Sequence, residues 1–297
     1  MSPGERRERA LVLAGGGAAG NAWELGLVAG LSDAGVDLLR ADLMVGTSAG
    51  STVAAQLASG RPPADLYSAI LAEVAPPRRD TGAQRGRGPT LSGPSYLEWS
   101  DRIIASAEDP SDMRRRLGAA ALDLDDPVGS APGRWRDVVA ARLPSHDWPQ
   151  QPLLITAVDA RTGEPAVFDR DSGVDLVDAV AASTSAMTPY RIGGNRYLNG
   201  GYRRSENADL AAGYERVLVL SPFGGRSRMP PEWGMALAVQ VDELRAAGSR
   251  VETVFPDEGA GDVFDANALD PSTRPQAARG GYDQGQDLAE VLRSFWA

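Results

Sequence analysis

Residues 43–50 read Leu-Met-Val-Gly-Thr-Ser-Ala-Gly, and this stretch decides the fold. Its three apolar residues predict a buried strand, and residues 49–59 predict a helix directly behind it. Ser48 therefore lies on a tight strand-to-helix turn, which is the setting of a nucleophile elbow. Gly46 and Gly50 give the Ser48 Oγ room to stand clear of the backbone. A helix N-cap serine is the alternative, but the glycines on both sides favour a nucleophile.

A second glycine cluster precedes the first. Residues 15–20 read Gly-Gly-Gly-Ala-Ala-Gly, between a predicted strand over 11–13 and a predicted apolar helix over 18–31. The backbone N–H groups of such a loop are free to bind an oxyanion, and we expect this of Gly15, Gly16, Gly17 and Ala18. The same spacing fits a dinucleotide-binding loop. That alternative requires an acidic residue after the second strand, where residues 46–48 instead form the elbow.

Together these segments resemble the patatin-like phospholipase family of serine acyl hydrolases. The resemblance covers residues 11–60 and 153–222. In that family a glycine-rich oxyanion loop comes first, the GxSxG serine follows, and an Asp-Gly-Gly or Asp-Gly-Ala far downstream supplies the acid of a Ser–Asp dyad. The resemblance implies one three-layer α/β domain over residues 1–297, with a mostly parallel central sheet and helices on both faces. It implies no metal and no organic cofactor.

The third family element is altered in this chain, where it reads Asn199-Gly200-Gly201. An amide cannot accept a proton near neutral pH, so the base of the dyad is missing. Ala19 also departs from the Arg or Lys that many relatives carry in the glycine loop. Three interpretations follow: an inactivated variant of an active enzyme, a natural relative whose base comes from elsewhere, including a substrate amine, or a pseudoenzyme kept for binding.

Other proton acceptors are few. The nearest carboxylates in the matching segments are Asp159, Glu206 and Asp209, and Asp159 follows a strand in a turn-like setting that favours a structural role. A Ser–acid–His triad of the α/β-hydrolase order requires His146, the sole histidine. We expect His146 to be a surface residue in the loop over 144–149. A dyad without histidine is the interpretation that remains.

Composition excludes several chemistries. The chain has no cysteine and no lysine, so its 30 basic residues are all arginine, and it has one histidine. Thiol nucleophiles, Ser–Lys dyads, Walker-type lysines and His-rich metal sites are therefore excluded. A net charge of −10 argues against nucleic acid and against strong adhesion to anionic membranes. No apolar stretch approaches ~18 residues, so we expect no signal peptide, no membrane span and a cytoplasmic location.

Residues 61–148 form a looser region that we expect to cover the substrate. Within it, the sequence predicts helices over 66–74, 96–107 and 135–142. The regular elements predicted after it are strand 153–158, a hairpin to 168, helix 176–183, a hairpin of 190–192 with 196–198, strand 216–220, helix 233–247, strand 251–255 and helix 288–296. Residues 114–116 are three arginines that predict a solvated helix face. Four more arginines lie in the predicted loop over 76–94, either as solvated side chains or as attractants for an anionic substrate.

The predicted function is serine acyl hydrolysis through an acyl-Ser48 intermediate. Ser48 attacks an ester, thioester or amide carbonyl, the N–H groups of Gly16, Gly17 and Ala18 stabilise the oxyanion, and Asn199 occupies the position of the family's Asp. An acyltransferase or thioesterase-type enzyme using the same serine is one alternative. A non-catalytic binder of acyl ligands is another. The identity of the lipid or other acyl substrate and the oligomeric state do not follow from the sequence.

Overall fold

The computed structural model describes residues 7–73, 93–125, 131–260, 263–264 and 267–297. The loop predicted over 76–94, with its four arginines, lies almost entirely outside them. No helix in the described part of the chain is long and apolar enough to cross a membrane.

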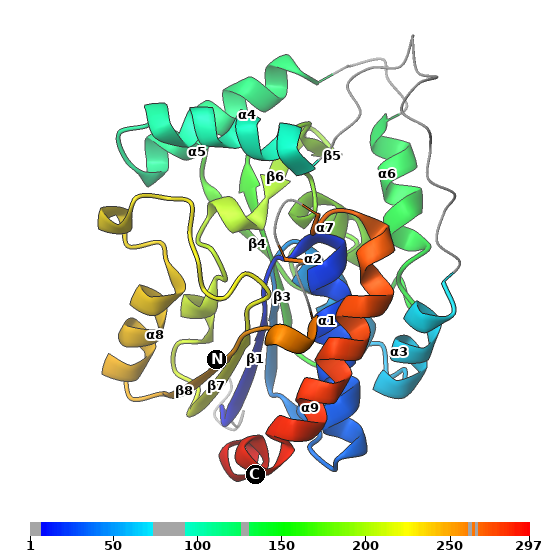
Figure 1. Ribbon diagram of the computed structural model, residues 1–297. Coiled ribbons are helices and arrows are strands. Elements are labelled where there is room, and N and C mark those ends of the chain that lie inside the picture. The colour runs from blue at the N-terminus through cyan, green and yellow to red at the C-terminus, as the bar shows by residue number, and fades with distance from the viewer. Residues whose placement is uncertain (1–6, 74–92, 126–130, 261–262, 265–266) are drawn as a thin grey trace.

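A single sheet forms the centre of the molecule (Figure 1). Five of its strands run parallel in the order β3-β2-β1-β7-β8. Their bounds are β1 (Arg9–Leu13), β2 (Leu43–Gly46), β3 (Leu153–Asp159), β7 (Arg216–Leu220) and β8 (Arg250–Val254). The antiparallel strands β4 (Pro165–Phe168), β5 (Tyr190–Ile192) and β6 (Asn195–Asn199) extend the sheet beside β3. The predicted mostly parallel sheet is confirmed.

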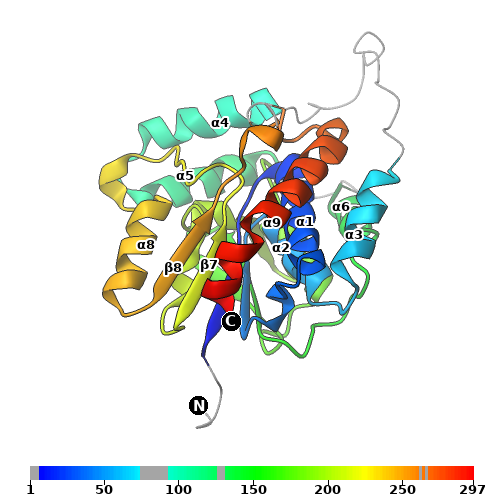
Figure 2. The same ribbon diagram turned by 60° about the horizontal axis from the view of Figure 1, so that its bottom comes forward.

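Helices cover both faces of the sheet because its strands are apolar on both sides. Leu11 and Leu13 of β1 face a core shared with α1 (Gly17–Asp33), α2 (Ala49–Leu57), α7 (Leu176–Ser183) and α9 (Arg274–Trp296). Ala10 and Val12 face the opposite core, which α8 (Leu237–Ala246) covers. Figure 2 shows α1 and α9 side by side, with α8 on the other side of β7 and β8. The fold is thus the three-layer α/β arrangement expected for parallel strands.

A helix is present over 288–296 as predicted, but its predicted start is wrong. The helix α9 begins at Arg274, and the glycines at positions 280, 281 and 285 lie inside it. A Cβ at Gly281 would overlap the carbonyl oxygen of Trp23 in α1, and one at Gly26 would overlap the carbonyl of Ala278 in α9. The two helices can approach this closely only because both carry glycine at the crossing.

The region between α2 and β3 is helical where it is described. It contains α3 (Pro63–Leu71), α4 (Gly93–Ser106), α5 (Pro110–Asp123) and α6 (Ala131–Ala140). Helices α4 and α5 pack with Val158, Leu198 and Tyr202 in a separate apolar cluster. The solvated face predicted for residues 114–116 holds for Arg115 and Arg116, whereas Arg114 is partly buried and donates to the carbonyl of Gly163.

Glu24 is a buried carboxyl in α1. It is 0% exposed, and neither of its oxygens has a hydrogen-bond partner among the described residues. Burial raises its pKa well above the ordinary value for Glu. With the folded-state pKa raised, the stability linked to Glu24 is fully present below the pKa of the unfolded chain, ~4.3, and is lost as the pH rises toward the folded-state value.

We expect the variant Glu24→Gln to become more stable than the parent chain as the pH rises. The gain in the free energy of unfolding should be on the order of 1 kcal/mol or more at about pH 8, because the parent must bury a charge or hold a proton there. Urea unfolding at about pH 5 and about pH 8 measures it. The exposed Glu232 provides the control Glu232→Gln, which should follow the parent. The same pH dependence in Glu24→Gln and the parent would contradict the expectation.

Candidate active site

Ser48 lies on a strained turn between β2 and α2. Its backbone has φ 53° and ψ −122°, a conformation that non-glycine residues rarely adopt and that structures retain at functional sites. The flanking glycines are sterically required. A Cβ at Gly50 would overlap the carbonyl oxygen of Leu13, and one at Gly46 would lie 2.6 Å from the Cα of Ser51. The turn therefore has the form predicted for the elbow.

Two serines hold this turn in place. The backbone N–H of Ser48 donates to the Oγ of Ser183, at 2.9 Å, and Ser183 is buried at the end of α7. The hydroxyl of Ser51 donates to the carbonyl oxygen of Ser48 at 2.6 Å. The sequence interpretation did not include Ser183. The signal for Ser183 in the sequence is the run of small residues over 182–186, at the end of the predicted helix over 176–183.

Asn199 meets Ser48 across 151 residues of sequence. Its Nδ2 donates to the Ser48 Oγ at 2.8 Å, and its Oδ1 accepts the backbone N–H of Gly201 at 2.9 Å. Since the N–H of Gly201 is a donor, the amide oxygen must face it, which leaves the NH₂ group facing the serine. Gly200 allows the turn to approach β3, because a Cβ there would overlap the side chain of Thr156. The residue in the predicted acid position is therefore a donor to Ser48.

The glycine loop lies beside the same serine. A Cβ at Gly15 would be 3.2 Å from the Cβ of Ser48. Gly16 is the N-cap of α1, and Gly17 has φ 63°. Among the described residues, no acceptor meets the backbone N–H of Gly16, Gly17 or Ala18. Within the described ranges these groups are therefore donors without an acceptor at a helix N-terminus, a setting that favours an anionic oxygen.

The other candidate proton acceptors bond elsewhere. Asp159 accepts backbone N–H groups of its own turn, including that of Arg161 at 2.8 Å, and Asp209 forms an ion pair with Arg203 at 2.7 Å. Glu206 accepts from the hydroxyls of Ser205 and Ser221, and burial raises its pKa. His146 is exposed, with its Nε2 3.0 Å from the carbonyl of Ala140. In the part of the chain that the structure describes, none of the four forms a hydrogen bond or an ion pair with Ser48.

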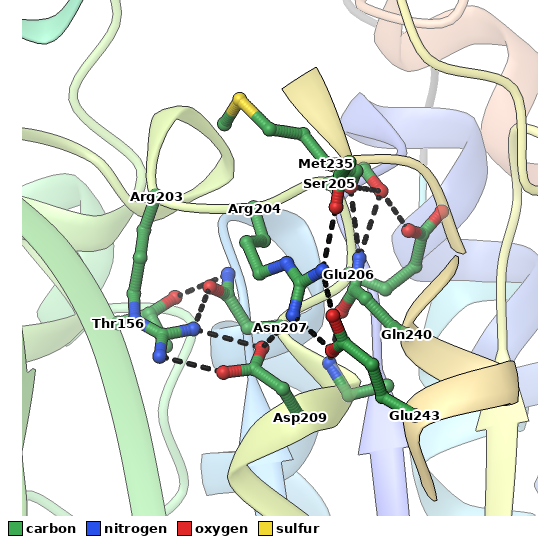
Figure 3. A network of polar contacts seen from close by, with 12 residues as sticks. Thr156, Arg203, Arg204, Ser205, Glu206, Asn207, Asp209, Met235, Gln240 and Glu243 are labelled. Carbon is green, nitrogen blue, oxygen red and sulfur yellow. Dashed lines mark hydrogen bonds and ion pairs between the residues drawn. The ribbon is translucent and has the colours of Figure 1, made fainter. Parts of the chain in front are cut away.

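A polar cluster with a buried centre adjoins the elbow at Thr47, and we call it the Asn207 cluster; Figure 3 labels Thr156, Arg203, Asn207 and Asp209 of it. It consists of Thr47, Thr156, Gly200, Arg203, Asn207 and Asp209. The Nδ2 of Asn207 donates to Thr47 Oγ1 at 2.9 Å, to Thr156 Oγ1 at 3.2 Å and to the carbonyl of Gly200 at 3.1 Å. Its Oδ1 accepts from Arg203 at 2.8 Å, and Arg203 also pairs with Asp209.

Asn207 therefore joins the residue before Ser48 to the residue after Asn199. It is 0% exposed and has φ 60°. Among the described non-glycine residues, only Ser48 shares a positive φ with it.

Ser48 opens into a cavity of about 570 Å³. Its walls include the glycine loop, Asn199, the segment 223–229 and residues 264, 268 and 269. Of the described residues in the predicted cover over 61–148, only Tyr96 and Leu97 of α4 line the cavity, so most of the wall comes from later in the chain. The hydroxyl of Tyr202 donates to that of Tyr96 at 2.8 Å, and burial raises both phenol pKa values, so neither phenol is a base at neutral pH.

The described residues include no group of three or more His, Asp or Glu side chains placed to hold a metal ion. The polar side chains among the described residues that line the cavity instead carry hydroxyls, one amide and two guanidinium groups. They suit a ligand with a carbonyl or anionic oxygen.

Comparison with known proteins decides the family. Residues 11–212 match the Patatin family, described as patatin-like phospholipase, over more than half of the chain. The chain belongs to the patatin-like phospholipases. None of the curated proteins matches it in sequence. Membership of this family supports lipid acyl hydrolase chemistry.

Solved structures give more distant similarities. VipD from Legionella pneumophila is 14% identical with a TM-score of 0.43, over 97% of this chain and 67% of that one. The type III effector ExoU is 20% identical with a TM-score of 0.42, over 98% of this chain and 54% of that one. ExoU of Pseudomonas aeruginosa in complex with SpcU is 19% identical with a TM-score of 0.36, over 95% and 53%. This patatin-like chain thus spans about half the length of the ExoU chains.

Proposed function

We propose that the chain is a serine acyl hydrolase for lipid or other ester substrates, working through an acyl-Ser48 intermediate with Asn199 in the position of the base. The observation that carries this proposal is the 2.8 Å contact between Asn199 Nδ2 and Ser48 Oγ on a strained elbow. A dyad residue belongs at this distance from its nucleophile. The backbone N–H groups of Gly16, Gly17 and Ala18, which meet no acceptor among the described residues, support the same proposal.

The proposed reaction begins when the Ser48 Oγ forms a bond to the ester carbonyl carbon. The carbonyl electron pair moves to its oxygen, which the three N–H groups stabilise. The hydroxyl proton of Ser48 passes to water or to a basic group of the substrate. The electron pair on the oxyanion then re-forms the C=O bond as the C–O bond to the alcohol breaks, and the alcohol takes up a proton as it leaves. Water then attacks the acyl-serine in the same way and releases the acid. An acceptor alcohol or amine in place of water makes the same site an acyltransferase.

Asn199 limits the proton transfer in this scheme. An amide has no basic site near neutral pH, and here its NH₂ group donates to the serine oxygen, so the Ser48 proton must leave to water or to a basic group of the substrate. The loss of a general base costs typically ~10²–10⁴ in rate. We therefore expect slow turnover rather than none.

Labelling of Ser48 by a fluorophosphonate tests the proposed function. The reagent should add slowly to Ser48 of the parent chain and not at all to Ser48→Ala, because the oxyanion donors remain although the base is missing. Intact mass and peptide mapping identify the modified residue.

A non-catalytic binder of acyl ligands is the second candidate, and the donor orientation of Asn199 favours it. In that case the parent chain stays unlabelled on a timescale at which Asn199→Asp is labelled completely. Labelling of the parent at other residues but not at Ser48 would contradict the acyl-serine mechanism.

A further inference from the structure

Arg274 is the first residue of α9, and its side chain lies beside the first turns of α1. The two helices run parallel, because a Cβ at Gly26 would overlap residue 278 and a Cβ at Gly30 would overlap residue 282. Their N-termini therefore lie at the same end of the molecule, where α1 begins in the glycine loop. The side chain of Arg274 is only 16% exposed, so it is held against this part of the protein.

The guanidinium of Arg274 uses all three of its nitrogens. Its Nη1 donates to the Oδ1 of Asn21 at 2.6 Å and lies 3.5 Å from the carbonyl oxygen of Ala18. Its Nε and Nη2 donate to the two carboxylate oxygens of Glu73, at 2.7 and 3.0 Å. Asn21 is buried and lies about one turn after Gly17. Arg274 therefore joins the beginning of α1 to the segment that follows α3.

Helix stability alone gives no reason for an arginine at this position. Helix N-termini carry a partial positive charge, which favours acidic residues, and Arg274 lies at the N-terminus of α9 and close to that of α1. The carboxylate of Glu73 offsets this repulsion. Its side chain is 45% exposed, however, and ion pairs of such exposure contribute little to the free energy of unfolding. We therefore look for the role of Arg274 in what it holds in place.

We propose that Arg274 is a positioning residue for the oxyanion donors, because it holds the first turn of α1 where its N–H groups receive the substrate's carbonyl oxygen. This inference rests on the proposed function. Arg274 is not among the described residues that line the cavity, so it acts through the turn and not on the substrate.

The segment before α9 supports the same turn at a second point. The N–H of Ala19 donates to the carbonyl oxygen of Ala268 at 3.0 Å, and a Cβ at Gly17 would lie 2.6 Å from that oxygen. The turn is thus held between residue 268 and the guanidinium of Arg274. Donors of an oxyanion site act only when they are aimed at the position that the charged oxygen occupies in the transition state.

Inhibition by octyl trifluoromethyl ketone tests this role in the Asn199→Asp background. The Ser48 Oγ bonds to the ketone carbon, the carbonyl electron pair moves to the oxygen, and the Ser48 proton passes to the carboxylate introduced at position 199. The adduct therefore carries the oxyanion. Adding Arg274→Gln should weaken this inhibition by ~10-fold and lower kcat for p-nitrophenyl butyrate by a similar factor, since displacing a donor should cost less than the ~10²–10³ of removing one. KM should change less than about twofold.

The matched control is Arg293→Gln. Arg293 also joins α9 to α1, but at the other end, where its Nη2 donates to the carbonyl oxygen of Ala34 at 2.7 Å. This variant should leave inhibition and kcat unchanged. Arg274→Lys keeps the charge and loses the planar fork that reaches Asn21 and Glu73 together, so its kcat should be intermediate, with the urea midpoint close to that of the Asn199→Asp parent.

The outcomes separate the positioning role from the function. An active Asn199→Asp chain whose inhibition and kcat are unaffected by Arg274→Gln would overturn the role of Arg274 and leave the proposed function standing. Equal losses in Arg274→Gln and Arg293→Gln, or a raised KM with kcat unchanged, would also overturn it. If Arg274→Gln does not fold, unchanged inhibition and kcat in Arg274→Lys would overturn it instead. An Asn199→Asp chain that neither turns over esters nor binds the ketone would overturn the proposed function, and this role with it.

Discussion

Asn199→Asp is expected to raise ester hydrolysis by at least ~10²-fold, which is the lower range of what a general base contributes. The substitution replaces the NH₂ group 2.8 Å from Ser48 Oγ with a carboxylate oxygen that accepts the serine proton. The other carboxylate oxygen keeps the bond from the N–H of Gly201. The two carboxylate oxygens can take the places of Nδ2 and Oδ1 of Asn199, so no rearrangement has to accompany the change. Values of kcat/KM for short p-nitrophenyl esters measure the effect.

Two controls belong with this experiment. Asn195→Asp adds the same charge to the same strand, β6, at an exposed position, and should leave the rate at the parent level. Ser48→Ala combined with Asn199→Asp should return the rate to background while the chain stays folded, because alanine fits the elbow. Equal rates for the parent and Asn199→Asp would show that the two residues do not form a dyad.

Asn207→Gly is expected to lower kcat by ~10–10²-fold in the Asn199→Asp background, with KM changed less than about twofold. Glycine accepts the positive φ of position 207, so the variant removes the side chain without straining the backbone. The bonds from Asn207 to Thr47 and to the carbonyl of Gly200 are then lost. These bonds fix the residues adjacent to positions 48 and 199. Without them, the distance between Ser48 Oγ and the side chain at position 199 should become less well defined.

A loss of stability alone must be distinguished from this positioning role. Asp209→Asn removes the ion pair with Arg203 at the outer end of the Asn207 cluster and leaves the donors of Asn207 in place. We expect it to lower the midpoint of urea unfolding but not kcat. If Asn207→Gly lowers that midpoint to a similar extent and leaves kcat unchanged, Asn207 is structural and has no positioning role.

The sequence predicts the parts of this molecule whose signals are local. The turn at 46–50 and the loop at 15–20 each combine an apolar strand, glycines and a following helix within about fifteen residues, and both have the predicted form in the structure. The signal for the start of α9 is not local in this sense. Gly280 and Gly281 weaken a helix in isolation, and only the close crossing with α1 makes them favourable there.

The walls of the site are harder to predict for the same reason. The segment 223–229 and residues 268 and 269 line the same cavity as Ser48 only because β7 adjoins β1 in the sheet and α9 packs on α1. Asn207 sits in an unremarkable polar stretch, and its partners come from β3, from the elbow and from the turn after β6. Strand order and packing bring these residues together, and neither can be read from a short window of sequence.

The turn after β6 also controls how fast Asn199 deamidates during storage. An asparagine followed by glycine loses its amide when the glycine nitrogen attacks the side-chain carbonyl carbon, and this cyclisation requires a backbone free to rotate. Here both the Nδ2 and the Oδ1 of Asn199 form hydrogen bonds, and Gly200 is packed against Thr156. Folded protein should keep its asparagine over long storage, whereas protein that has been denatured and refolded should contain a fraction with aspartate in that position. Two preparations of identical sequence can therefore differ in hydrolytic rate according to their history.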